Sequence, residues 1–455
     1  MRQIADFHIH SKYSRACSSQ LTLENIEKAC RTKGVDIIAT GDFTYPEWFL
    51  GIKNELEETS INPPNPACPA DRSLYQGGDC GPPLRKGGRG GKSGGKNEDA
   101  GCLYKLKKSN DGKIKFILST ELALIYKDGD RARRIHIMVH APNIKAVEEL
   151  NKYLDKNYNI RSDGRPILGM KAPDLVKLCL SIHPHFLIYP AHIWTPWFSV
   201  FGSKSGFDSM EECFHEQVKN IYAYETGLSS DPEMNWRLSA LDKLTLLSNS
   251  DAHSLINIAR EANVFDLDKV SYDKIYQAIK QKKNLQYTIE FYPEEGMYHY
   301  DGHRECGICL MPQESKKNNN ICPVCKKPLT IGVLNRVAEL ADRSEGYKLK
   351  TAPGFKKLVE LDKIIAVSLN IKNRQAQKVQ IEYNNLIKKL GSELHILLEA
   401  PLADIAQVAN TNLAEGIKRV REGNLIISPG FDGQYGQIKI FLDNGRKEGR
   451  QRSLL

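Results

Sequence analysis

The sequence predicts an α/β fold that begins with a β/α barrel. Short apolar runs alternate with amphipathic, helix-like segments through about residue 290, which is typical of parallel β/α architecture. About seven such runs favour a barrel over an open sheet, although periodicity alone does not decide between them. After Tyr300 the pattern changes to a cysteine-rich module and then to helical segments. We therefore predict a barrel over residues 1–300, a zinc ribbon over 301–330 and a mostly helical, mixed region over 331–455.

The predicted elements of the barrel follow one another in regular order. The expected strands are 4–7, 35–40, 114–119, 135–139, 186–190, 221–224 and 244–247. Helical patterns occupy 23–33, 144–154, 172–180, 210–218, 232–241 and 272–282. Gly34 directly follows the first helical pattern and is suited to end it. Further helical patterns lie at 331–343, 376–390 and 402–422, before a stretch rich in Gly and β-formers at 425–442.

One segment, residues 60–101, breaks this order. It holds ten Gly and six Pro and very few large apolar residues. Such a composition cannot bury enough surface to offset the entropy of ordering, so it predicts a disordered insertion. A nucleic-acid-binding tail of the RGG kind is the alternative interpretation.

Composition and charge narrow the class of protein. The chain has 455 residues, enough for two or three domains, with 41% hydrophobic and 26% charged residues. It shows neither a long apolar stretch nor an apolar signal core, so we expect a cytoplasmic protein without a membrane partner. The net charge is +9, and residues 301–455 hold 25 Lys/Arg against 17 Asp/Glu. This excess indicates a surface for DNA or another polyanion, or simply a lysine-rich solvated surface.

Four of the eleven cysteines have the spacing of a metal site. Cys306 and Cys309 form one C-x2-C pair, and Cys322 and Cys325 form a second pair twelve residues later. Two such turns close a tetrahedral zinc site. Because four thiolates leave no open position, this zinc is expected to be structural.

Ligand-type side chains follow nearly every predicted strand. In a β/α barrel, the carboxyl ends of the strands converge on one mouth. Imidazole and carboxylate donors together suit Zn²⁺, Mn²⁺ or Fe, and a cluster of two or three such ions activates water and clamps a phosphoester. The residues concerned are His8, His10, Asp42, Glu121, His136, His140, His192, Glu225, Asp251 and His253.

These motifs resemble the PHP phosphoesterase superfamily. The opening H-x-H, the Glu and His residues on later strands and the final D-x-H are similar to its pattern, which implies a distorted seven-stranded barrel. More narrowly, residues 190–198, 225–232 and 248–253, the ribbon and residues 333–343 resemble endonuclease Q. The implied fold is a PHP-type barrel followed by a four-cysteine zinc ribbon and a small, mostly helical C-terminal domain.

The resemblance also implies an activity and a ligand set. Endonuclease Q proteins hydrolyse DNA on the 5′ side of deaminated bases (uracil, hypoxanthine, xanthine) or abasic sites, so damaged DNA is the expected partner. Two or three divalent metals (Zn, Mn or Mg) are expected in the active site. One metal is assigned to His8, His10, Glu121 and Asp251, a second to Glu121, His136 and His192, and a third to His253 and Asp42. His136 is preferred to His140, and Asp251, Glu121 and His192 are the expected catalytic residues.

Two departures put the third metal in question. Phe43 stands where superfamily members often have His, and Tyr45 stands where a further His is expected. Around the mouth, a flipped base is expected to meet aromatic side chains. Expected substrate contacts are Trp194, Trp197, Phe198 and Glu225, with packing of the barrel rim as the alternative for the aromatic residues.

Two other functions stay open. The barrel motifs also permit a small-molecule phosphatase, although such an enzyme needs neither the zinc ribbon nor a basic C-terminal region. A non-catalytic DNA-binding module with a decayed metal cluster is the other alternative.

Overall fold

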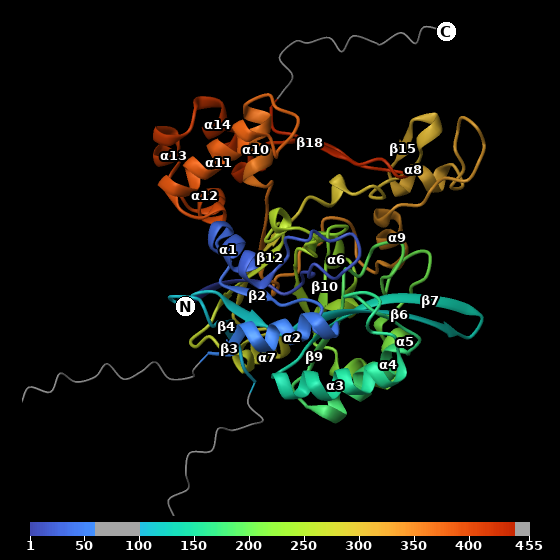
Figure 1. Ribbon diagram of the computed structural model, residues 1–455. Coiled ribbons are helices and arrows are strands. Elements are labelled where there is room, and N and C mark those ends of the chain that lie inside the picture. Colours follow the sequence, from blue (N-terminus) through green and yellow to red (C-terminus); the bar gives the residue numbers. More distant parts are fainter. Residues whose placement is uncertain (60–100, 442–455) are drawn as a thin grey trace, which may run out of the picture.

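The computed structural model describes residues 1–59 and 101–441 (Figure 1). Nearly all of the segment predicted to be a disordered insertion lies outside the described residues. In Figure 1 the barrel occupies the lower half. The C-terminal helices (orange) and the zinc module around β15 and α8 stand above it on the same side. The mixed α/β fold with a helical C-terminal region is confirmed.

The larger sheet of the barrel is centred on β1 (Arg2–Asp6). β1 pairs in parallel with β2 (Ile37–Ala39), which pairs in parallel with β5 (Lys115–Ile117). On its other side β1 pairs antiparallel with β12 (Ala262–Asp266). The sheet is completed by β13 (Leu285–Glu290) and β16 (Gly354–Lys357) at one edge and by β4 (Tyr104–Leu106) and β3 (Leu56–Glu58) at the other.

The remaining barrel strands form two smaller sheets. A long antiparallel hairpin of β6 (Ser119–Asp128) and β7 (Arg131–His140) lies between β8 (Ile167–Leu168) and β9 (Leu187–Pro190). β10 (Ala223–Glu225) and β11 (Thr245–Leu247) pair in parallel, and β9 packs beside β10. A bridge between Ile9 and Ala252 joins the end of β1 to the loop after β11. The ends of these strands therefore face a common centre.

The predicted barrel strands all form, but the barrel is not uniformly parallel. The run at 135–139 lies in β7, which is antiparallel to both of its neighbours. β12 and β13 were not predicted, because polar residues such as Asn263 and Gln286 interrupt their apolar pattern.

The helices of the barrel follow the predicted amphipathic segments closely. α1 (Leu23–Lys33) has the predicted bounds; the Thr22 side chain caps its first turn, and Gly34 ends it at φ 91°. α3 (Ile144–Asn157), α4 (Ala172–Ile182) and α7 (Tyr272–Gln281) also form. The predicted helices at 210–218 and 232–241 are broken into α5 (Met210–Phe214) and α6 (Pro232–Asn235), each followed by a 3₁₀ turn. α2 (Pro46–Glu55) was not predicted.

The C-terminal part consists of the zinc module and a helical bundle. The module contains β14 (Asp301–His303), β15 (Ile308–Leu310) and α8 (Pro312–Lys317), and α9 (Val333–Leu340) follows it. β16 then pairs with β13 of the barrel sheet, so the chain rejoins the barrel after the module. The bundle comprises α10 (Leu361–Ser368), α11 (Gln377–Leu390), α12 (Glu393–Leu398), α13 (Leu402–Val408) and α14 (Thr411–Glu422). The hairpin of β17 (Ile426–Ser428) and β18 (Gln437–Lys439) runs from the bundle toward the zinc module (Figure 1).

No helix within residues 1–59 and 101–441 is both long and apolar enough to cross a membrane.

Beneath the site, the fully buried carboxyl of Glu290 makes stability depend on pH. Thr226 and Thr288 donate hydrogen bonds to it, yet burial raises the pKa of Glu290 from 4.5 to about 8. Between these values the folded chain binds more protons than the unfolded chain, so stability falls as pH rises from about 4.5 to about 8. Glu290→Gln keeps the shape without the ionisation. We expect thermal unfolding at several pH values to show a smaller decline for this variant between pH 5 and 8.

Glu149→Gln, at an exposed position of α3, is the matched control and is expected to follow the wild-type pH profile. An unchanged slope for Glu290→Gln would show that this carboxyl does not carry the pH dependence.

Candidate metal centre

The first two histidines of the site emerge directly from β1. His8 and His10 are fully buried, and each has its Nδ1 beside a carboxylate: the His8 atom lies 3.1 Å from both oxygens of Glu225, and the His10 atom lies 3.0 Å from Asp42 Oδ1. A carboxylate at Nδ1 orients the ring and leaves Nε2 as the donor to a metal. His8 Nε2 is buried and has no hydrogen-bond partner among the described residues. The site thus presents a buried donor of the kind that a metal ion satisfies.

Two adjoining groups of donors share one residue. In the first group the donor atoms of His8, His10, Glu121 and Asp251 all lie within 4.8 Å of one another. Glu121, His136 and His192 form the second group by the same measure. The Oε1 atom of Glu121 lies 2.8 Å from His136 Nδ1 and 3.0 Å from His192 Nε2, while its Oε2 lies 3.4 Å from His10 Nε2. Oε1 therefore faces both histidines of the second group, Oε2 faces His10 of the first group, and His8 Nε2 lies 3.7 Å from Oε1, so Glu121 joins the two groups.

The backbone is strained at three positions of this site. Asp42, His192 and Asp251 have φ values of 47°, 27° and 45°, in the left-handed region that non-glycine residues rarely adopt. Such strain persists at functional sites when the surrounding structure holds the residue in place. Beside His192, a Cβ on Gly227 would lie 2.3 Å from the His192 Cβ, so only glycine fits there.

The electrostatics of the site favour ionised carboxylates. Burial acts to raise the pKa of Glu121, but His136, Arg165 and His8 outweigh it and hold this pKa well below its ordinary value. For Asp251 burial likewise opposes ionisation, and His8 and His10 lower its pKa well below the usual range. Burial acts to lower the pKa of His8, yet the surrounding carboxylates raise it well above its ordinary value. A divalent cation would replace the protons held here, so metal binding would release protons.

The structure does not assemble the third group expected from Asp42 and His253. Asp42 Oδ2 accepts hydrogen bonds from the backbone N–H of Ser11 at 2.6 Å and from the hydroxyls of Ser11 and Ser14, so this carboxylate serves to hold His10. His253 has its Nδ1 2.9 Å from the backbone oxygen of Asp251. Neither residue belongs to a donor group among the described residues. The two departures from the family pattern have packing roles: Phe43 is buried in the core, and Tyr45 stacks on Tyr13.

The residues expected to contact the substrate differ in their exposure to solvent. The structure does not support substrate contacts by Trp194, whose indole is 1% exposed and bonds Asn235, or by the fully buried Glu225, which holds His8. Phe198 packs against His136 with ring centroids 4.6 Å apart. Trp197 is 43% exposed, so it is available to a substrate at the mouth.

His140 lies outside both donor groups, because its Nε2 bonds the Tyr189 hydroxyl at 2.9 Å.

Arg165 is the site residue that the sequence did not reveal. Its Nη1 lies 2.9 Å from Glu121 Oε2, and its side chain is 24% exposed. It stands in a polar loop between α3 and α4, where nothing in the residue pattern distinguishes it from neighbouring charged residues.

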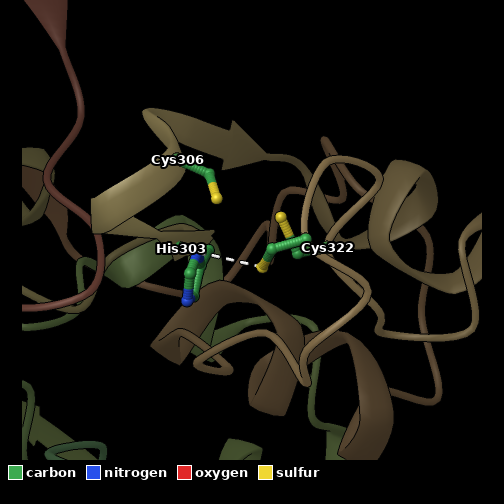
Figure 2. A group of neighbouring side chains, drawn as sticks. His303, Cys306 and Cys322 are labelled. Carbon is green, nitrogen blue, oxygen red and sulfur yellow. Dashed lines mark hydrogen bonds between the residues drawn. The ribbon is translucent and has the colours of Figure 1, made fainter.

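The zinc module differs from the expected four-cysteine set at one ligand. His303, Cys306, Cys322 and Cys325 bring their donor atoms within 4.8 Å of one another, whereas Cys309 lies outside the group. Figure 2 shows His303, Cys306 and Cys322 directed toward a common centre. The His303 ring nitrogen Nδ1 lies 3.6 Å from the sulfur of Cys325. One imidazole and three thiolates are a donor set that suits a structural zinc.

The register of the β14–β15 hairpin explains the exchange of ligand. His303 pairs with Ile308, and Gly302 pairs with Cys309. Paired residues share a face and successive residues alternate, so Cys309 lies on the face opposite His303. The ring of Phe431 covers that face, only 2.4 Å from where a Cβ on Gly302 would lie. The spacing of the cysteines carries no information about this register.

The barrel and its two adjoining groups of His and carboxylate donors together define a metal-dependent phosphoesterase. Comparison with solved structures identifies the particular family. The chain is similar to the lesion-specific endonuclease PfuEndoQ from Pyrococcus furiosus, with a TM-score of 0.77 and 28% identity, covering 96% of this chain and 95% of that one. It is similar as well to an endonuclease Q in complex with a 27-mer duplex substrate that has an abasic lesion at the active site. That match has a TM-score of 0.76 and 28% identity and covers 97% of both chains. The structure of this chain therefore matches the endonuclease Q family.

Sequence comparison finds relatives over shorter spans. The uncharacterized protein MJ0043 of Methanocaldococcus jannaschii is 32% identical over 255 residues, which is 54% of this chain and 31% of that protein. The chain thus spans less than a third of that relative's length. The uncharacterized protein YqxK of Bacillus subtilis is 28% identical over 311 residues, covering 67% of this chain and 74% of that protein. Residues 360–424, which contain the helical bundle, match the family described as MJ0043 C-terminal domain.

The contact between His8 and Glu225 predicts how the first donor group responds to a lost charge. Glu225→Gln keeps the side-chain shape but removes the carboxylate that orients His8. We expect affinity for a divalent metal to fall about 10–100-fold, as measured by competition with a chelator. Glu148→Gln, at an exposed position, is the control and is expected to bind metal as the wild type does. Equal affinities of Glu225→Gln and the wild type would contradict this role of Glu225.

The ligand exchange in the zinc module predicts a contrast between two variants. His303→Ala removes a donor, so it is expected to weaken metal binding in the module, whereas Cys309→Ser is expected to leave it unchanged. Substitution with Co²⁺ distinguishes the sites, because the barrel groups contain no cysteine and only the module gives thiolate-to-cobalt absorption. Loss of that absorption in Cys309→Ser, with retention in His303→Ala, would instead support the four-cysteine set.

Proposed function

We propose that this protein is a metal-dependent DNA repair endonuclease. It hydrolyses the phosphodiester on the 5′ side of a deaminated base (uracil, hypoxanthine or xanthine) or of an abasic site. The observation that carries this proposal is the pair of donor groups that share Glu121, set in a chain that matches a lesion-specific endonuclease over 96% of its length. Under this proposal it acts on cytoplasmic DNA.

The donor groups support metal-dependent hydrolysis. Two divalent ions (Zn, Mn or Mg) held in these groups would polarise a phosphodiester and activate water. His8 and His10 supply rings fixed by Glu225 and Asp42, so they need no rearrangement to serve as ligands. Asp251 is 21% exposed, whereas Glu121 is fully buried, so Asp251 is the more accessible of the two carboxylates in the donor groups. We assign ligand roles to His8, His10, Glu121, His136, His192 and Asp251.

Positive charge in the zinc module and its connector supports DNA as the substrate. The zinc module and its connector, residues 301–359, hold 11 Lys/Arg and 6 Asp/Glu, whereas residues 360–424 hold nine and eight. The basic excess therefore belongs mainly to the module and its connector together, not to the helical bundle. Its exposed lysines are Lys316, Lys317, Lys326 and Lys327. Such side chains bind the phosphates of DNA without reading its sequence.

Residues on either side of the module contact the loop after β9. Tyr298, just before β14, meets the exposed Trp197 ring edge-on with centroids 5.8 Å apart. Arg336 of α9 donates to the backbone oxygen of Phe201 at 3.2 Å. We propose that Trp197 stacks on DNA at the lesion, where an extrahelical base requires an aromatic surface.

An incision assay tests the proposed function. Duplexes with uracil, hypoxanthine, xanthine or an abasic site are incubated with the protein and Mn²⁺, Mg²⁺ or Zn²⁺, and the products are mapped at nucleotide resolution. We expect cleavage 5′ of the lesion that chelators abolish, and a loss on the order of 10²–10³-fold in Asp251→Asn. Asp268→Asn, at an exposed position in an ion pair with Lys274, is the control and is expected to cleave normally. Hydrolysis of small phosphomonoesters without any cleavage of these duplexes would overturn the proposal.

A further inference from the structure

The guanidinium of Arg165 lies at the mouth of the barrel, beside the carboxylate that joins the two donor groups. Its Nη1 is 2.9 Å from Glu121 Oε2, which is the oxygen that also faces His10. This is its only side-chain hydrogen bond among the described residues. The other N–H donors of the guanidinium are therefore available, and the side chain is 24% exposed.

The residue after Arg165 is tied to the strand that carries Glu121. The Ala123 N–H of β6 donates to the Pro166 oxygen at 3.1 Å, and in the parallel pairing of β6 with β8 Ala123 stands opposite Ile167. Arg165 stands in the loop directly before β8, so this pairing anchors the chain on its C-terminal side.

The residues before Arg165 pack directly against the site. A Cβ on Gly164 would lie 2.5 Å from both Asp42 Oδ2 and Ser14 Oγ, so the chain approaches the partner of His10 as closely as glycine permits. Asp163 Oδ1 accepts a hydrogen bond from the Arg165 backbone N–H at 3.0 Å. These contacts hold the segment against the mouth before any substrate arrives.

A purely structural ion pair would use the guanidinium differently. Arg165 bonds one oxygen of Glu121 through a single N–H, whereas a bidentate pair would use both oxygens, so this contact leaves most of the guanidinium unused. A partly exposed arginine beside the metal ligands is suited to bind a phosphodiester, because the paired N–H groups of its planar guanidinium match two phosphate oxygens. Negative charge on those oxygens increases in the transition state of hydrolysis, where a fixed cation is most effective.

We propose that Arg165 contacts the substrate and donates a hydrogen bond to a non-bridging oxygen of the scissile phosphodiester. This role rests on the proposed function. It adds to the metal ligands a protein group that binds the reacting phosphate directly.

Steady-state cleavage of an abasic-site duplex by Arg165→Gln, Arg165→Lys and the wild type tests this role. Arg165→Gln is expected to lower kcat on the order of 10²–10³-fold with a much smaller change in KM, and with the metal content of the wild type. Arg165→Lys keeps the charge without the fork and is expected to fall between the two. Arg161→Gln, in the same loop but in a surface ion pair with Asp155, is the matched control and is expected to retain wild-type kcat.

A second measurement separates contact from mere positioning. Duplexes with each phosphorothioate diastereomer at the scissile linkage are cleaved by the wild type and by Arg165→Gln. If Arg165 contacts the phosphate directly, replacing one non-bridging oxygen by sulfur is expected to slow cleavage by the wild type. The same replacement is expected to slow cleavage by Arg165→Gln much less.

Three results would overturn the role. They are an unchanged kcat in Arg165→Gln, a loss of bound metal that accounts for its defect, and equal phosphorothioate penalties in the variant and the wild type. If Arg165→Gln fails to fold, a wild-type kcat in Arg165→Lys would overturn the role of the guanidinium fork. If the wild type does not cleave these duplexes, the proposed function is wrong, and the role of Arg165 falls with it. If the wild type cleaves them and any of the three results is found, only the role of Arg165 is wrong.

Discussion

The whole site depends on the placement of one carboxylate. Glu121 is 1% exposed and lies among four histidines and an arginine, and it belongs to both donor groups. A buried carboxylate is costly unless cations surround it. Here the surrounding groups hold its pKa well below the ordinary value in spite of burial. The arrangement of β6, β7 and β9 around it is what brings His136 and His192 to one of its oxygens.

The second constraint is the fixed orientation of the histidines on β1. Glu225 fixes the ring of His8 through its Nδ1, and Asp42 fixes the ring of His10 in the same way. The Nε2 atoms of both rings are therefore already oriented to bind a metal. Asp42 is itself held by Ser11 and Ser14, and the backbone around it is strained at φ 47°. The fold therefore supports the ligands with a second layer of buried polar contacts. In this layer Glu225 and Asp42 contact the histidines, and neither belongs to a donor group among the described residues.

Much of the fold could be predicted because each element depends on local pattern. The bounds of α1 follow from its apolar spacing, its Thr22 cap and Gly34. The antiparallel direction of β7 could not be predicted, because hydrophobic periodicity is the same for both directions. The residues of the site were recognisable because ligand-type side chains at strand ends converge in a barrel. Their division into metal ligands and supporting residues depends on distances that only the folded chain contains, as the roles of Asp42 and Glu225 show. Arg165 was missed because it stands among other charged residues in a polar loop, and His303 was missed because the register of the β14–β15 hairpin, not residue spacing, brings it to the zinc site.

Locating the metals tests the shared role of Glu121 most directly. Anomalous diffraction from crystals grown with Mn²⁺ would place each ion relative to Glu121. If Glu121 joins two metal sites, two peaks are expected on either side of its carboxylate, separated by about 3.5–4 Å, as in two-metal hydrolases. A single peak, or a peak beside Asp42 and His253 with none near His136 and His192, would contradict the shared carboxylate on which the proposed function rests.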